Sequence, residues 1–231
     1  EALAPVLTES FERIGATLDR YADGQPREIL TVGVVGTFAA HWLLPRLAAF
    51  RQALPHIDLR LMTNNNRVEL ANEGLDFAIR YGDGAWRGVH AEPIMDAPLT
   101  PLCAPQIAER LSSPSSLAGQ TLLRSYRPDE WPAWFAMAGC DCPRLEGPVL
   151  DSTALMAAAA EQGAGVALAP PAMFSRAIAA GRLSRPFPEE IAPGRYWLTR
   201  LQSRDPGPAG LAFREWLLAE AEPATENSAL R

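Results

Sequence analysis

The sequence predicts an α/β protein with two lobes, and three observations support this prediction. Strands and helices alternate after residue 26 with few hairpin signals, which is typical of sheets with parallel strands. A unit of strand, small polar residue and helix occurs twice, in VVGTFAAHWLL and in PVLDSTALM. Thr37 and Ser152, one from each unit, lie 115 residues apart, about the length of one lobe. The 231 residues suffice for two such cores.

In the first half of the chain, the hydrophobic pattern predicts three strands and two helices. Residues 30–35 form an apolar, β-branched run, and residues 57–63 alternate apolar with polar side chains, so both are predicted strands. Residues 37–54 carry apolar side chains at helical spacing and predict a helix. A short helix at 68–73 and a strand at 75–80 follow.

In the second half, short apolar runs again alternate with helical patterns, so the same fold class continues to the end of the chain. The predicted strands are 99–103, 122–124, 149–150, 166–169 and 196–201. The predicted helices are 106–111, 131–138, 152–162, 171–179 and 209–220.

The two ends of the chain fall outside this alternation. Residues 1–22 predict a helix whose apolar side chains recur at near-heptad spacing, followed by a linker that ends at Pro26. This helix either packs on its own domain or pairs with a copy of itself and continues toward an N-terminal domain. The first residue is Glu rather than Met, and we expect the chain to be a piece of a longer protein. Residues 223–231 are predicted to be a disordered tail.

Composition and charge exclude several classes of protein. The net charge is −6, so a basic surface for nucleic acid is not expected in this chain. All 21 basic residues are arginine, which excludes a lysine Schiff base and a P-loop lysine. No apolar run approaches the ~20 residues that span a bilayer, and no secretory signal is recognised. We therefore expect a cytoplasmic protein without a membrane segment.

Metal and catalytic signatures are weak. The odd number of cysteines, Cys103, Cys140 and Cys142, fits a reducing compartment. Cys140 and Cys142 could contact a metal, but no further ligand lies nearby in sequence, so no metal is expected. His41 is expected to pack and His56 to cap a turn. The motifs of zinc proteases, serine hydrolases and P-loop enzymes are absent, so we expect neither an enzyme nor a cofactor.

A binding site for an acidic ligand is the stronger prediction. The first N–H groups of a helix point outward and carry the positive end of the helix dipole, and such termini bind carboxylates and phosphates. Gly36 would let a ligand approach the backbone, and Thr37 would add a hydroxyl donor. Alternatively, Thr37 serves only as the N-cap of its own helix, and the same alternative holds for Ser152 and Thr153. Because the arrangement occurs in both lobes, we favour a ligand held between them.

Three further segments are weaker candidates. RYGDGAW, from Arg80 to Trp86, is a glycine-containing loop that suits either recognition of a polar ligand or an ordinary turn. TNNNRVE contains Glu69 and three asparagines that either form turns and caps or donate to a ligand. RSYRPDEW, residues 124–131, is dense in hydrogen-bonding groups, as the rim of a cleft or a capping box would be.

Several segments resemble a known family. GTFAAHWLLPRL, HIDLRLMTNNNRVELANEGLDFAIRYGDGAW, TLLRSYRPDEW, AEQGAGVALAP and YWLTRLQSR are similar to the effector-binding domains of LysR-type transcriptional regulators, and more narrowly to the AmpR-type regulators of chromosomal β-lactamase genes. The resemblance runs from about Ala2 to Leu218. PHIDL, the RYGxGxW loop and the YWxTRLQSR strand are together quite specific, whereas GxGVALAP alone would indicate only the LysR family at large.

The resemblance implies a periplasmic-binding-protein-like fold of type II, with two Rossmann-like lobes and an effector cleft between them. Residues 27–95 and 196–222 would form the first lobe, and residues 96–195 the second. Residues 1–26 would be the end of a linker and dimerisation helix. A winged helix-turn-helix would precede this chain and bind promoter DNA. The protein would be a homodimer, or a tetramer at full length.

The resemblance also implies the ligands and the residues that bind them. Such regulators respond to peptidoglycan precursors and recycling fragments, a UDP-MurNAc-peptide and anhydro-muropeptides. Thr37, Ser152 with Thr153, and Tyr196 would bind the effector. Gly36 and Glu69 fall where changes in the family are associated with constitutive activation. The glutamate stands where many relatives have aspartate, which preserves the charge and adds a methylene.

Arg80 and Trp86 complete the set of predicted effector-binding residues. A solute-binding protein for a small anionic ligand remains the alternative function, since it would share the fold and the cleft. The heptad pattern of residues 1–22 does not suit that alternative.

Overall fold

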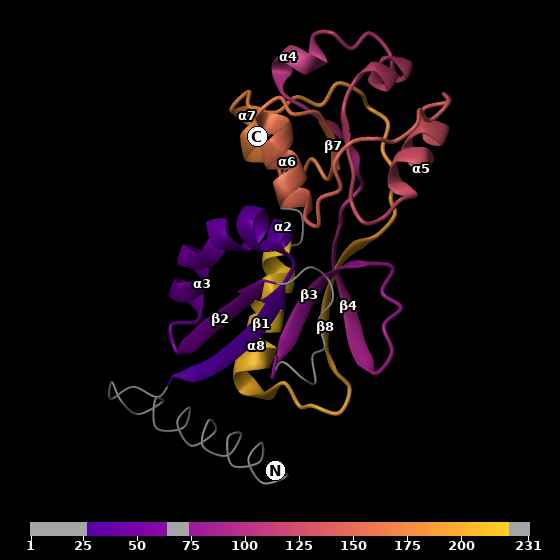
Figure 1. Cartoon of the computed structure of the whole chain (residues 1–231). Coiled ribbons are helices and arrows are strands. Elements are labelled where there is room, and N and C mark those ends of the chain that lie inside the picture. The colour runs from indigo at the N-terminus through magenta and orange to yellow at the C-terminus, as the bar shows by residue number, and fades with distance from the viewer. Residues whose placement is uncertain (1–26, 64–73, 222–231) are drawn as a thin grey trace, which may run out of the picture.

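The computed structural model describes residues 27–63 and 74–221 (Figure 1). The predicted helix at 1–22, its linker, the short helix at 68–73 and the tail at 223–231 lie outside the described residues. Among those described, no helix combines the length and the apolar character needed to cross a membrane.

The larger sheet, which defines lobe I, has five strands. They are β1 Glu28–Val34, β2 Ile57–Thr63, β3 Phe77–Gly82, β4 Val89–Asp96 and β8 Arg195–Leu201. Their order is β2-β1-β3-β8-β4. β1 is parallel to β2 and β3, as predicted, whereas β8 is antiparallel to both β3 and β4. The chain leaves the sheet at the carboxyl end of β4 and re-enters it, as β8, at that same end of the strands. β8 must therefore run antiparallel to its neighbour β4.

β4 was missed by the sequence analysis. Its sequence VHAEPIMD mixes polar and apolar side chains without clear alternation, and its register shifts between Pro93 and Met95. A proline donates no hydrogen bond to a sheet, so a run that contains one looks like a loop. The strand forms because β8, from a distant part of the chain, pairs with it along its length.

The helix predicted at 37–54 is broken into four pieces. These are α2 Gly36–Phe38, a π-helical turn at Ala39–Leu43, a 3-10 turn at Leu44–Arg46 and α3 Leu47–Ala53. Pro45 lacks an N–H and its ring crowds the carbonyl four residues earlier, which interrupts the regular ladder. The Arg46 side chain donates to the Trp42 carbonyl at 3.1 Å and lies over the Trp42 ring.

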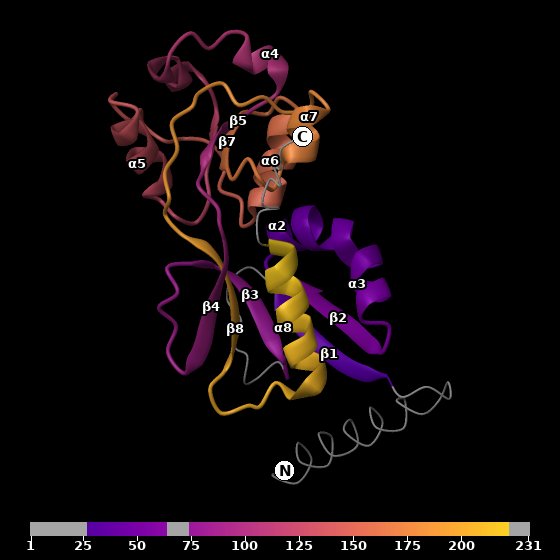
Figure 2. The same cartoon turned by 180° about the vertical axis from the view of Figure 1, so that it is seen from behind.

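The helix α8 Gly207–Ala221 crosses one face of the large sheet (Figure 2). Val32 and Phe77 of the sheet are almost completely buried beneath it and α3. Phe50 of α3 and Phe213 of α8 meet edge-on with ring centroids 6.1 Å apart. Burial of each such aromatic side chain contributes about 1.5–3 kcal/mol to folding.

Lobe II is built on a smaller sheet of order β5-β7-β6. Its strands are β5 Thr100–Leu102, β6 Leu122–Leu123 and β7 Val166–Ala169. Its helices are α4 Pro105–Ala108, a 3-10 helix at Pro114–Gly119, α5 Glu130–Met137, α6 Thr153–Glu161 and α7 Ser175–Ala179. The core on the α5 side is aromatic: Trp131 and Trp134 are buried, and each indole N–H donates to a backbone carbonyl.

The two lobes are joined in two different ways. On one side, the chain crosses between them twice, and Leu99 and Ile191 on the two crossings exchange backbone hydrogen bonds. On the other side, one apolar cluster continues from lobe I into α6 and the segment before α7. There the His41 ring contacts the Phe174 ring at a centroid distance of 4.4 Å, which confirms the prediction that this histidine packs.

Candidate functional site

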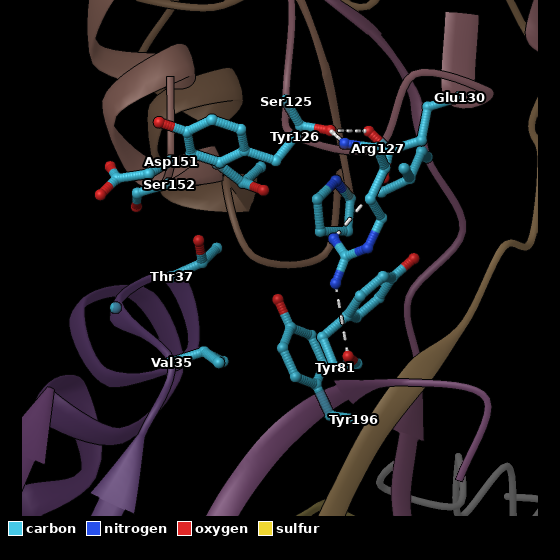
Figure 3. A pocket seen from close by; sticks show the side chains of 14 residues that line it. Val35, Thr37, Tyr81, Ser125, Tyr126, Arg127, Glu130, Asp151, Ser152 and Tyr196 are labelled. Carbon is cyan, nitrogen blue, oxygen red and sulfur yellow. Dashed lines mark hydrogen bonds and ion pairs between the residues drawn. The ribbon is translucent and has the colours of Figure 1, made fainter. Parts of the chain in front are cut away.

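A cavity of about 520 Å³ lies between the lobes, at the carboxyl ends of β1 and β3 (Figure 3). Open α/β sheets bind ligands at this edge of the sheet, and the volume is in the range of small-molecule sites. Lobe I and its last strand contribute Val35, Gly36, Thr37, Tyr81 and Tyr196. Lobe II and the crossing segment contribute Leu99, Ser125, Tyr126, Arg127, Glu130, Asp151, Ser152, Thr153 and Pro170.

Thr37 does not cap its own helix. Val35 occupies the N-cap position of α2, and no side chain caps that helix. Instead, the Thr37 hydroxyl oxygen accepts a hydrogen bond of 3.1 Å from the backbone N–H of Ala154, in the first turn of α6. A residue of one lobe therefore performs for a helix of the other lobe what an N-cap performs locally. Its own O–H proton can still be donated to a ligand.

The start of α6 forms the opposite wall. Ser152 stands at the N-cap with extended backbone, but its hydroxyl makes no capping hydrogen bond. A Cβ placed on Gly36 would lie 3.7 Å from the Ser152 hydroxyl, so the two predicted motifs face each other directly. The nine residues of α6 carry a dipole whose positive end faces the cavity. By contrast, α2 runs for only three residues before a π-helical turn and a 3-10 turn follow, so the two helix starts differ in regularity.

Two tyrosines form the floor of the cavity on the side of lobe I. The end of β3 pairs with the beginning of β8, and this antiparallel register places Tyr81 opposite Tyr196. Their rings are 5.3 Å apart and edge-on, and Phe38 packs against the second of them. Burial raises the pKa of both phenols, so each remains a neutral donor.

A polar group from lobe II lies across from these tyrosines, and Figure 3 shows its contacts. Glu130 is 7% exposed, and the Ser125 hydroxyl donates to its carboxylate at 2.6 Å. Arg127 lies 3.6 Å from the other carboxylate oxygen and donates to the Tyr81 backbone carbonyl at 3.4 Å. Burial raises the pKa of Glu130, while Ser125 and Arg127 act in the opposite direction.

The structure brings five of the predicted site residues to one cavity: Gly36, Thr37, Ser152, Thr153 and Tyr196. Arg80 and Trp86 do not line it. Arg80 is buried in β3 with its guanidinium 5.5 Å from the Trp86 ring, and this ring packs against Trp197. Successive side chains of a strand point to opposite faces, so Arg80 faces away from the side that Tyr81 occupies. Glu69 lies outside the described residues.

Sequence reasoning did not assign Tyr81, Ser125, Tyr126, Arg127, Glu130 or Asp151 as binding residues. Four of them belong to the segment RSYRPDEW, whose density of hydrogen-bonding groups suited either the rim of a cleft or a capping box. The sequence did not distinguish these alternatives, because the contact that decides between them, from Arg127 to Tyr81, spans 46 residues.

Metal binding finds little support in the described part of the chain. It contains no group of three or more His, Cys, Asp and Glu side chains arranged to hold an ion. All three cysteines are free, and burial raises the pKa of the Cys103 thiol to about 11. His56, the predicted turn cap, is exposed, and its backbone carbonyl accepts from the N–H of Glu28.

Comparisons with known proteins agree with this architecture. Residues 23–222 match the family model described as the LysR substrate binding domain. The HTH-type transcriptional activator AmpR of Pseudomonas aeruginosa is 55% identical over 223 residues, which cover 96% of this chain and 75% of that protein. The solved structure of the effector domain of AmpR from Pseudomonas aeruginosa superposes with a TM-score of 0.81 at 56% identity, over 84% of this chain and 96% of that one.

A second similar solved structure is that of a domain with amino acid substitutions. It is the effector-binding domain from Citrobacter freundii with three substitutions, threonine to valine, serine to alanine and tyrosine to phenylalanine. It superposes with a TM-score of 0.82 at 43% identity, over 84% of this chain and all of that one. From its fold and these similarities, the chain belongs to the family of LysR substrate-binding domains, within the group of AmpR-type regulators.

Proposed function

We propose that this chain is the sensor domain of a regulator that controls β-lactamase expression in response to peptidoglycan precursors and recycling fragments. The effector would be a UDP-MurNAc-peptide in the repressing state and an anhydro-muropeptide in the activating state. The cavity between the lobes is its binding site, with Thr37, Ser152, Thr153 and Tyr196 in contact with it.

The observation that carries the proposal is the meeting of Thr37 with the first turn of α6 at the cavity wall. Peptide carboxylates and phosphates are stabilised by N–H groups and hydroxyls at a helix start. The tyrosine floor adds two neutral phenols and apolar area, which suits the peptide and sugar portions of such a ligand.

The Citrobacter freundii structure adds a second line of support. Its three substitutions remove the hydroxyl of a threonine, a serine and a tyrosine. Those are the residue types that this cavity presents at Thr37, Ser152 and Tyr196, with Thr153 beside the serine.

The proposed mechanism is a shift between two arrangements of the lobes. A ligand shifts such an equilibrium only by the difference between its affinities for the two arrangements. Precursor and fragment would compete for one cavity and hold the lobes at different angles. Gly36 lies where the two walls meet, so a large side chain there would alter that angle without any ligand.

The partners follow from the family. We propose that the chain forms a homodimer, or a tetramer at full length, and that it acts in the cytoplasm on promoter DNA through an N-terminal domain outside this chain. A solute-binding protein for a small anion would share the cavity. The match to HTH-type activators over 96% of the chain favours the regulator.

Isothermal titration calorimetry of the isolated domain tests the proposal, with an anhydro-muramoyl tripeptide and a UDP-MurNAc-pentapeptide as probes. Thr37→Val and Thr153→Val should each weaken binding by about 1–3 kcal/mol if the hydroxyl bonds a buried ligand group. Thr63→Val is the matched control, because this exposed threonine at the end of β2 does not line the cavity.

Two results would contradict the proposal. One is the absence of binding heat with either wall fragment for a correctly folded domain. The other is equal binding by the wild type and both cavity variants.

A further inference from the structure

Arg127 is the one cation among the described residues that line the cavity. It lies in the loop before α5, and 43% of its side chain is exposed. The guanidinium stacks over the Tyr81 ring at 4.9 Å and also reaches the Tyr81 backbone carbonyl. Because Arg127 belongs to lobe II and Tyr81 to lobe I, this side chain connects the lobes across the cavity.

The present hydrogen-bonding partners of this guanidinium hold it weakly. Its distance to the carbonyl is 3.4 Å and its distance to the Glu130 carboxylate is 3.6 Å. Both exceed the range of about 2.7–2.9 Å found for charge-assisted hydrogen bonds. A guanidinium carries five N–H donors in a planar fork that fits a carboxylate or phosphate with two parallel bonds. An incoming anion would therefore form a stronger contact than either partner provides.

Glu130 does not depend on Arg127 for its position. The Ser125 hydroxyl holds one of its oxygens at 2.6 Å, and the carboxylate is buried at the start of α5. A ligand could thus displace the guanidinium while the loop that carries it remains anchored.

We propose that Arg127 binds an acidic group of the effector and in doing so releases Tyr81. This inference rests on the proposed function and assigns to one residue both the recognition of an anion and a contact that holds the two lobes together. The opposite junction, where α2 faces α6, is held by the apolar cluster that continues across the lobes. The Arg127 side adjoins the two chain crossings, where Leu99 and Ile191 exchange backbone hydrogen bonds of 2.7 and 3.0 Å, so release of Tyr81 would let the lobes rotate about these crossings.

A second hollow supports access to this residue. It has a volume of about 540 Å³ and lies on the outer side of the same loop, between Pro128 and Pro193. Tyr126, Arg127 and Glu130 line both hollows. A long ligand could extend from the cavity past this loop, and the guanidinium would be within reach of an acidic group on either part.

The first experiment compares an anhydro-muramoyl tripeptide with its fully amidated form by calorimetry. Arg127→Met keeps an apolar stem and removes the charge, and it should weaken binding of the acid at least tenfold and of the amide less than twofold. Arg127→Lys keeps the charge without the fork and should lie between. Arg144→Met is the control, since its side chain is 89% exposed and lies outside the cavity.

The second experiment needs no wall fragment. Nitrogen NMR follows the side-chain Nε–H signal of Arg127, assigned with Arg127→Met, during titration with acetate and with inorganic phosphate. A saturable shift is expected, accompanied by a shift of the Tyr81 carbonyl carbon with the same apparent Kd.

The outcomes separate the two proposals. Equal weakening of acid and amide by Arg127→Met would overturn the role of Arg127, as would the absence of any NMR shift with either anion. If no wall fragment binds but the small anions produce the shift, Arg127 is an anion receptor and the proposed function fails.

Discussion

The two walls of the cavity differ in rigidity and in charge. The polar side chains in the wall of lobe I are Thr37, Tyr81 and Tyr196, which are 6%, 8% and 3% exposed and carry no charge at neutral pH. The wall of lobe II presents Arg127 on the same loop as Tyr126, which is 71% exposed, and Glu130 at the start of α5. The wall of lobe I is therefore part of a hydrophobic core, whereas much of the wall of lobe II is a polar loop that lies over a core.

This difference suggests that the two walls of the cavity have different roles in ligand binding. Side chains packed into a core keep one position, because any change leaves a void or a clash. Side chains on a loop can change partners at small cost. We infer that lobe I supplies a preformed surface for the ligand and that lobe II supplies the groups that respond to it.

The largest expected effect tests whether the tyrosine floor belongs to the core. Tyr196→Ala should lower the free energy of unfolding by about 3–5 kcal/mol, as the loss of a buried aromatic side chain does. Tyr126→Ala, in the other wall, should change it by no more than about 0.5 kcal/mol because that ring is largely exposed. Urea unfolding of both variants measures the difference, and similar losses would remove the distinction between the walls.

The next effect concerns the crossing between the lobes. A Cβ added at Gly194 would lie 2.9 Å from the backbone carbonyl oxygen of Gly82. Gly194→Ala should therefore destabilise the protein by about 1–3 kcal/mol, since neither backbone can move easily. Gly119→Ala serves as the control, because a Cβ there meets nothing within 4 Å. Thermal unfolding should separate the variants, and equal midpoints would show that the crossing is pliable.

A smaller effect is expected at the contact between the walls. Thr37→Val removes the oxygen that accepts from Ala154 and should cost about 1 kcal/mol, as the loss of an N-cap does. Amide hydrogen exchange at Ala154 should quicken in this variant. Thr37→Ser keeps the hydroxyl and should leave the exchange rate near that of the wild type. Unchanged exchange in Thr37→Val would mean that the hydroxyl does not cap α6.

The smallest effect is a dependence on pH in the wall of lobe II. Burial raises the folded-state pKa of Glu130 above its unfolded value. Between the two pKa values the folded state binds more protons, so its contribution to stability is lost as pH rises. Glu130→Gln should remove this loss, and its melting temperature should gain on the wild type as the pH rises above the unfolded-state pKa of about 4.3.

Glu146→Gln is the comparison for that series, since the Glu146 side chain is 70% exposed. If the melting temperatures of the wild type and Glu130→Gln changed in parallel with pH, burial would not raise the pKa of the Glu130 carboxylate.

Much of the fold could be predicted because its signals are local. The run at residues 30–35 and the helical spacing that follows it indicate a strand and a helix without knowledge of anything distant. The strand at Val166–Ala169 was predicted with its exact bounds, since all four of its residues are buried and apolar. β4 and the antiparallel direction of β8 could not be predicted, because both depend on pairing between remote segments.

The candidate site shows the same limit. Thr37 and Ser152 stand out in the sequence because a small polar residue at a strand end is a recognisable local pattern. Arg80 and Trp86 were weaker candidates, and only the tertiary structure shows that they pack together outside the cavity.

The order of residues alone determined that this chain alternates strands and helices, that it carries two hydroxyl-bearing helix starts, and that its negative charge and lack of lysine exclude several chemistries. Only the tertiary structure decided that Thr37 caps the helix of the opposite lobe and that Arg127 reaches Tyr81 across the cavity. The reason is that a side chain's type and local spacing are written in the sequence, whereas its partner depends on how distant segments pack together.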